Sequence, residues 1–149
     1  LAGLRSRIVA VLVTDILPPG GRRLSSMARK SARILSRTVD LGDSRVQAGD
    51  FDIRRGFVGR AYGAPTEAGR QARDRLLALE GIRLETTYSA KCLAALIAAA
   101  AETKYKSAPV LFWNTYSSID PSLHLGPLPD YRSLPAAFHR FFEGDVEID

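Results

Sequence analysis

Two short apolar runs, rich in β-branched and aromatic residues, constrain the fold of this chain more than any other feature. Ile8–Val13 reads IVAVLV, and Ala108–Trp113 reads APVLFW. Continuous apolar composition is typical of strands that are covered on both faces, as in a parallel sheet. A long connection between two such strands contains crossover helices. The runs therefore predict an α/β fold with three layers and a mostly parallel sheet, in which Ile8–Val13 and Val110–Trp113 are neighbours or near-neighbours.

Three helical segments are expected between the two runs. The first covers Leu24–Leu35, where apolar residues recur at helical spacing. The second begins at Pro65–Glu67, a helix-start signal, and ends at Gly81, a glycine suited to a C-cap. The polar stretch Asp40–Asp52, which separates them, is predicted to be a loop.

The third helical segment follows Thr87 or Ser89, either of which would cap it. Its high alanine content favours a helix and permits close packing. Its expected inner face consists of Cys92, Leu93, Leu96, Ile97 and Ala100.

The composition and periodicity of the chain change after residue 119. The stretch DPSLHLGPLPDYRSLP, from Asp120, contains four prolines and has no periodicity. We therefore expect one domain over residues 1–119 and a proline-rich tail over residues 120–149. Phe138, Phe141 and Phe142 lie on a possible short helix near the end of that tail.

Composition narrows the class of protein. The chain has 149 residues, 46% apolar and 25% charged, which is globular composition and enough for one domain. The net charge of +5 is spread over scattered residues, so a nucleic-acid-binding stripe is not expected. The single cysteine, Cys92, excludes an intrachain disulfide and a cysteine zinc site, and we interpret it as a small core residue. No metal site is predicted.

Membrane and export signals are not expected either. No apolar run reaches the roughly eighteen residues of a membrane span. The run Ile8–Val13 lacks the small-residue cleavage pattern of a signal peptide, so a cytoplasmic protein is expected.

The segment Gly56–Cys92 carries residues in the register of a known family. It contains Tyr62-Gly63-Ala64-Pro65-Thr66-Glu67, then Glu80-Gly81, Glu85, Tyr88 and Lys91, with the two tyrosines 26 positions apart. This pattern resembles the C-terminal third of the aminocyclopropane-carboxylate deaminase and D-cysteine desulfhydrase family. These are pyridoxal-phosphate enzymes with a tryptophan-synthase-β-like fold. The looser likeness covers roughly residues 1–118, so the resemblance implies a partial, C-terminal portion of that fold.

The resemblance implies roles for three residues. Tyr62 and Tyr88 match the family's active-site tyrosines, which meet the substrate as nucleophile, acid or orienting group. Thr115 takes the place of the hydroxyl that meets the pyridine nitrogen of pyridoxal phosphate. A phenol titrates at about pH 10, so it acts as a base only beside a positive charge or in a hydrogen-bond network. The alternative is structural: two half-buried tyrosines with satisfied hydroxyls, and a threonine that caps local backbone.

Lys91 invites assignment as the lysine that forms the Schiff base with the cofactor. The resemblance argues against it, because that lysine lies in the family's N-terminal part, before the phosphate loop. Lys91 matches a lysine in the Tyr-x-x-Lys turn, where it is expected to support structure or to pair with a carboxylate. His124 and His139 receive no role.

The chain also departs from the family pattern. Tyr116 and Ser117 replace two glycines that let the backbone approach the cofactor. Ser89 stands where deaminases proper have glutamate, so cyclopropane ring opening is not favoured over β-elimination from a cysteine-like amino acid. By the resemblance, the chain is expected to begin just after the family's phosphate loop, so the matching phosphate loop and Schiff-base lysine are not expected within it. We therefore expect a missing N-terminal half or a homo-oligomer to complete the site, and neither tight cofactor binding nor activity from this chain alone.

Two other functions stay open at this point. The chain could be a non-catalytic remnant or binding module that keeps the sheet and has lost the chemistry. It could also be an unrelated doubly wound nucleotide-binding domain, although it lacks the G-x-G-x-x-G and G-x-x-x-x-G-K patterns.

Overall fold

The computed structural model describes residues 6–15, 20–41, 46–106, 109–117, 119–120, 123–126 and 129–143. The chain divides into two compact units, residues 1–114 and 115–149. The elements of the first unit are, in order, β1 (Ile8–Val11), α1 (Gly21–Leu35), η1 (Ala48–Asp50), β2 (Phe51–Arg54), α2 (Glu67–Glu80), α3 (Ser89–Ala100) and η2 (Thr103–Tyr105). The expected α/β class is thereby confirmed.

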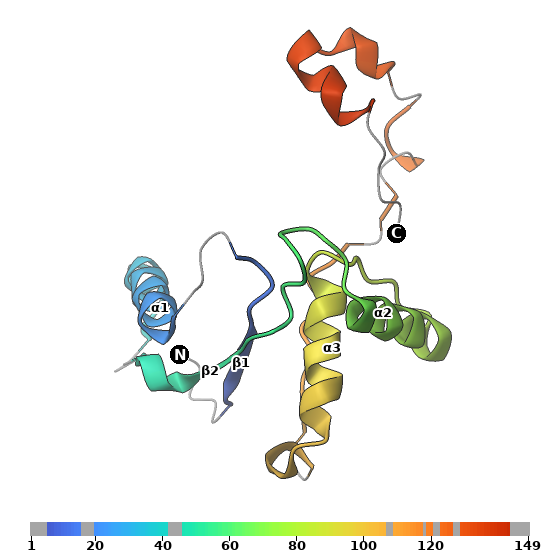
Figure 1. Ribbon diagram of the computed structural model, residues 1–149. Coiled ribbons are helices and arrows are strands. Elements are labelled where there is room, and N and C mark those ends of the chain that lie inside the picture. Colours follow the sequence, from blue (N-terminus) through green and yellow to red (C-terminus); the bar gives the residue numbers. More distant parts are fainter. Residues whose placement is uncertain are drawn as a thin grey trace. The chain divides into compact units, whose positions relative to one another are not determined.

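A β-α-β arrangement opens the first unit. β1 and β2 pair in parallel, with Ile8 opposite Phe51 and Val11 opposite Arg54. α1 lies on the connection between them (Figure 1), as parallel pairing requires. The first apolar run is confirmed as a strand, although it ends at Val11. The predicted loop was wrong at its end, because Phe51 begins β2.

The second apolar run is not a strand. Residues 109–117 contain no strand, and the sheet has two strands within the described ranges. The side chains of Leu111 and Trp113 are 84% and 79% exposed, whereas Phe112 packs against the core. The predicted pairing of Ile8–Val13 with Val110–Trp113 is therefore wrong. A strand needs a partner backbone along an edge, and apolar composition alone does not supply one.

α2 and α3 pack side by side and enclose most of the core (Figure 1). The hydroxyl of Thr66 accepts a hydrogen bond from the backbone N–H of Gly69 at 3.1 Å, which caps the start of α2. Gly81 ends the helix with φ of 68°. Both predicted ends of this helix are confirmed. The main core cluster consists of Ala72, Leu84, Ala90, Leu93 and Ala94.

The buried face of α3 is rotated from the predicted one. The buried residues are Ser89, Ala90, Lys91, Leu93, Ala94, Ala95 and Ala99. Ile97 and Ala100, predicted to point inward, are exposed, whereas Leu93, at 8% exposure, is buried as predicted. The distance between packed helices depends on the side chains at the contact. Alanines permit a close approach, so here the small residues mark the contact face.

A charged network joins β2 to η2. Arg54 donates hydrogen bonds to both carboxylate oxygens of Glu102 and to the hydroxyl of Tyr105. Asp52 accepts hydrogen bonds from Lys104 and from Tyr105, each at 3.0 Å. The bond from Lys104 holds the pKa of Asp52 below its ordinary value, and Arg54 does the same for Glu102. The network pairs its charges internally and anchors the strand.

The second unit contains η4 (Tyr131–Ser133) and η5 (Ala136–Phe141). The rings of Tyr131 and Phe142 stack with centroids 5.1 Å apart. The expected short helix near the end of the tail is present as η5. Across the described parts of both units, no helix has the length and apolar character needed to cross a membrane.

Candidate functional site

Tyr62 lies in a turn that leads into α2. The backbone N–H of Ala64 donates to the carbonyl of Ala61 at 3.2 Å, which closes the turn around Tyr62. Gly63 follows with φ of 80°, a conformation that glycine adopts without steric cost. The Thr66 cap then fixes the start of α2, so hydrogen bonds order the backbone on both sides of Tyr62.

Tyr88 is the N-cap residue of α3, and Glu85 holds it in place. The carboxylate of Glu85 accepts hydrogen bonds from the backbone N–H groups of Thr87, Tyr88 and Ser89. A negative charge is favourable at this end of a helix. The prediction that Thr87 or Ser89 would cap the helix was wrong, because the longer Glu85 side chain reaches all three N–H groups. An acidic residue four positions before the helix was the available sequence signal.

The hydroxyls of Tyr62 and Tyr88 hydrogen-bond to each other. The ring centroids are 6.1 Å apart, and the rings are inclined by 59°. The structure thus brings together the two tyrosines that the sequence singled out. Their side chains are 46% and 45% exposed, so the hydroxyl pair is open to a ligand from solvent.

The hydrogen bond to Tyr62 raises the pKa of Tyr88 above its ordinary value, and partial burial and the charge of Glu85 act in the same direction. Tyr88 therefore keeps its proton at neutral pH. In this arrangement it is a hydrogen-bond donor or an acid, and it is not a base.

Lys91 lies in the first turn of α3, and none of its side chain is exposed. Its Nζ donates a hydrogen bond to the carbonyl of Val58 at 2.7 Å. Burial lowers the pKa of Lys91, and the charges of Glu85 and Asp15 oppose that shift. The partner is a backbone carbonyl, where the sequence had suggested structural support or a carboxylate.

Thr115 is exposed and is the first residue of the second unit. Its place beside the tyrosines therefore stays a prediction. Cys92 is partly buried, and burial raises the pKa of its thiol, so the thiol is neutral and not activated. Within the described ranges, no group of three or more His, Cys, Asp or Glu side chains is placed to hold a metal ion.

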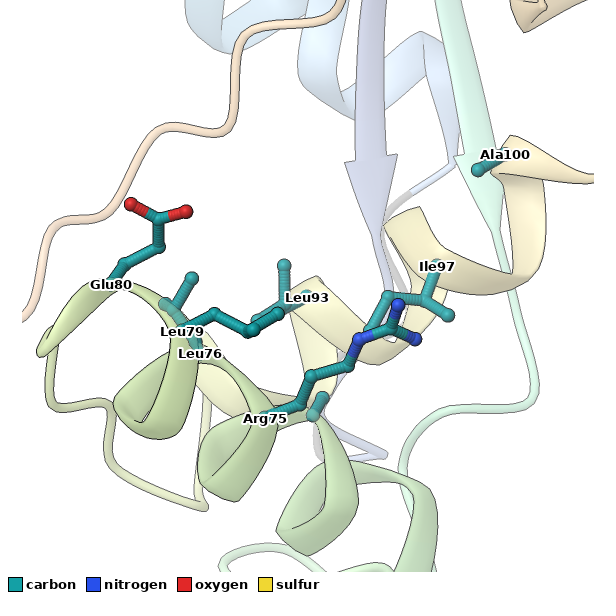
Figure 2. Close-up of a pocket in the computed structure, with 8 residues that line it drawn as sticks. Arg75, Leu76, Leu79, Glu80, Leu93, Ile97 and Ala100 are labelled. Atoms are coloured by element: carbon teal, nitrogen blue, oxygen red, sulfur yellow. The ribbon is translucent and has the colours of Figure 1, made fainter.

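A groove of about 430 Å³ runs between α2 and α3, away from the residues predicted for the site. Figure 2 shows Leu76 and Leu79 from α2 and Leu93 and Ile97 from α3 along this groove. Arg75 is one of its two charged lining residues. The groove is mostly apolar and contains no tyrosine, threonine or lysine.

In comparisons with known proteins, no family model and no curated protein matched the chain. The resemblance described above therefore depends on the matched residues themselves and on the geometry that joins two of them.

Replacing Glu85 with alanine should destabilise the first unit by about 0.5–2 kcal/mol, the range for loss of a helix N-cap. Three backbone N–H groups at the start of α3 would lose their carboxylate acceptor. Urea unfolding followed by circular dichroism measures the change. Glu80→Ala is the control, because Glu80 is exposed and lies at the C-terminal end of α2, not at the start of α3. Equal unfolding midpoints for the two variants would show that Glu85 is not the cap.

Proposed function

We propose that this chain is the C-terminal portion of a pyridoxal-phosphate-dependent lyase or deaminase that acts on a small amino acid. The reaction is β-elimination from a D-cysteine-like substrate or deamination of aminocyclopropane carboxylate, and it releases ammonia and a 2-oxo acid. Ser89, in the place of the deaminase glutamate, makes the first of these the reaction to assay first.

The contact between the hydroxyls of Tyr62 and Tyr88 is the observation that supports this proposal most directly. The two residues come from separate turns before separate helices. The family that the chain resembles uses a tyrosine pair at this spacing to meet its substrate.

Thr115 is the residue of this chain that would contribute to the cofactor's surroundings. When bound, pyridoxal phosphate withdraws electrons from the substrate carbon that loses its proton. The hydroxyl of Thr115 is exposed and would meet the pyridine nitrogen. Lys91 is buried on the Val58 carbonyl, which supports the expectation that a different lysine carries the cofactor. In the related family, that lysine and the phosphate loop lie before the segment that this chain matches.

The tyrosine pair would orient the substrate and supply a proton. An ordinary phenol is protonated at neutral pH, and the hydrogen bond to Tyr62 raises the pKa of Tyr88 further. Tyr88 can therefore donate to a group on which negative charge develops, which is how a positioned acid accelerates a reaction.

Expression of the complete reading frame that contains this chain tests the proposal. The purified protein should bind pyridoxal phosphate, measured by its visible absorbance, and should release sulfide, ammonia and pyruvate from D-cysteine. Aminocyclopropane carboxylate, which would give ammonia and 2-oxobutanoate, is the alternative substrate. Residues 1–149 alone should show neither tight binding nor turnover. A complete protein without cofactor binding or turnover would overturn the proposal and favour a non-catalytic binding module.

A further inference from the structure

Lys91 connects the two segments that carry the tyrosines. Its Nζ donates to the carbonyl of Val58, which lies in the chain shortly before Tyr62. Lys91 itself lies one turn after Tyr88 on α3. The segment before α2 passes over the N-terminal end of α3, where this hydrogen bond is made (Figure 1). The bond therefore joins the backbone of one tyrosine's segment to the helix of the other.

The stem of Lys91 is also enclosed by α2. A Cβ atom added at Gly69 would lie 3.6 Å from the Cγ of Lys91 and 2.9 Å from the hydroxyl oxygen of Thr66. The 3.6 Å distance is ordinary van der Waals contact, so the first turn of α2 lies alongside the stem of Lys91. Three segments meet at this side chain: the turn region before α2, the start of α2 and the start of α3.

Burial of an ammonium group lowers the stability of the fold, so it is not expected where a side chain only occupies space in the core. A buried charge is unfavourable unless it is paired and hydrogen-bonded. Methionine has a similar length and would fill the space without that cost. What lysine adds is a directional hydrogen bond to the Val58 carbonyl, which fixes one segment relative to the other.

We infer that Lys91 is a positioning residue for the tyrosine pair: its bond to the Val58 carbonyl holds the segment of Tyr62 against α3, so that the two phenol hydroxyls meet. Any effect on catalysis rests on the proposed function. The effect on the geometry of the pair does not, so the two can be tested separately.

The test is Lys91→Met, with Lys106→Met as the matched control on an exposed lysine. The readout is the pKa of Tyr88, followed by carbon-13 NMR of tyrosine-labelled protein and assigned with Tyr88→Phe. The charge of Lys91 is not among the causes of the raised Tyr88 pKa, whereas the bond to Tyr62 is the largest. A change in that pKa therefore reports the geometry of the pair.

In Lys91→Met, the pKa of Tyr88 should fall toward the ordinary tyrosine value while circular dichroism stays native, and Lys106→Met should change neither. In the active complete protein, kcat should fall by about tenfold or more, since small misplacements of catalytic groups have large effects. A native Lys91→Met with an unchanged Tyr88 pKa would overturn the inference, whether or not the protein is an enzyme.

A second variant covers the case in which Lys91→Met does not fold. Lys91→Leu also removes the hydrogen-bond donor but places a shorter apolar side chain in the buried position, and its Tyr88 pKa is interpreted in the same way. Loss of the native fold in both variants would also overturn the inference, because the lysine would then hold the whole unit together and not the pair in particular.

Discussion

Replacing Tyr88 with phenylalanine is expected to lower kcat/KM by about 10²–10⁴-fold in the protein expressed from its complete reading frame, the range for loss of a positioned acid. The substitution keeps the ring and removes the hydroxyl that meets Tyr62. Because the Tyr88 side chain is nearly half exposed, its packing contribution is small and the fold should survive. Steady-state assays of sulfide and pyruvate release measure the loss, with circular dichroism as the check on folding.

Tyr62→Phe should have a second, distinguishable effect. The hydrogen bond between the Tyr62 and Tyr88 hydroxyls is the main cause of the raised Tyr88 pKa, so its removal lets that pKa fall. If protonated Tyr88 is the acid, activity is lost as pH rises through its pKa. The alkaline limb of the kcat/KM profile should therefore move to lower pH in Tyr62→Phe.

Tyr131→Phe is the control for both tyrosine variants. Its hydroxyl contacts Glu143 in the second unit and has no role in the proposed site. Activity within about twofold of the parent protein is expected for this variant. If Tyr62→Phe and Tyr88→Phe also keep most of the activity, the two tyrosines are structural and the proposed roles are wrong.

The helices were predictable because their signals are local. Thr66 and Gly81 mark the two ends of α2 in the sequence, and the structure uses both residues as caps. Cap preferences depend on a few neighbouring residues, so no knowledge of the rest of the fold is needed. The same holds for α1, whose helical periodicity is visible over Leu24–Leu35.

The strands were harder because pairing is not local. Phe51–Arg54 follows a polar stretch and is short, yet it forms β2 because β1 offers it an edge. Val110–Trp113 has stronger strand composition and forms no strand. Strand propensity depends on the partners that a segment meets, and one sequence does not reveal which segments will lie beside each other.

The site was predictable in part. The resemblance singled out Tyr62 and Tyr88, and the structure joins their hydroxyls. The sequence did not indicate the carbonyl of Val58 as the partner of Lys91, because the backbone of every residue offers the same acceptor. Glu85 was visible as one matched residue, but its hydrogen bonds to three N–H groups depend on where α3 begins.

The predicted inner face of α3 differs from the observed one, because the alanines are on the contact side of the helix. The predicted inner face consisted of Cys92, Leu93, Leu96, Ile97 and Ala100. In the structure, Ala95 is 2% exposed and Ala100 is on the exposed side. An aspartate introduced at one or the other of these two positions tests which face of α3 is buried.

Ala95→Asp should destabilise the first unit by about 3–5 kcal/mol at pH 7, the cost of an unpaired buried charge. That is a large fraction of the roughly 5–15 kcal/mol that stabilises a typical domain. Ala100→Asp is the matched control on the same helix. A carboxylate there is near the negative end of the helix, which costs about 0.3–1 kcal/mol. Urea unfolding of both variants measures the difference.

The difference should also depend on pH. In Ala95→Asp, burial would raise the pKa of the introduced carboxyl group in the folded state above its unfolded value of about 4. The unfolded chain then releases its proton first as pH rises, so the penalty grows above about pH 4 and is relieved as pH falls back toward it. Loss of the Asp52 and Glu102 ion pairs at low pH affects both variants alike. A gap between the two variants that narrows from pH 7 to pH 4 is expected, and equal stabilities at pH 7 would show that Ala95 does not face the core.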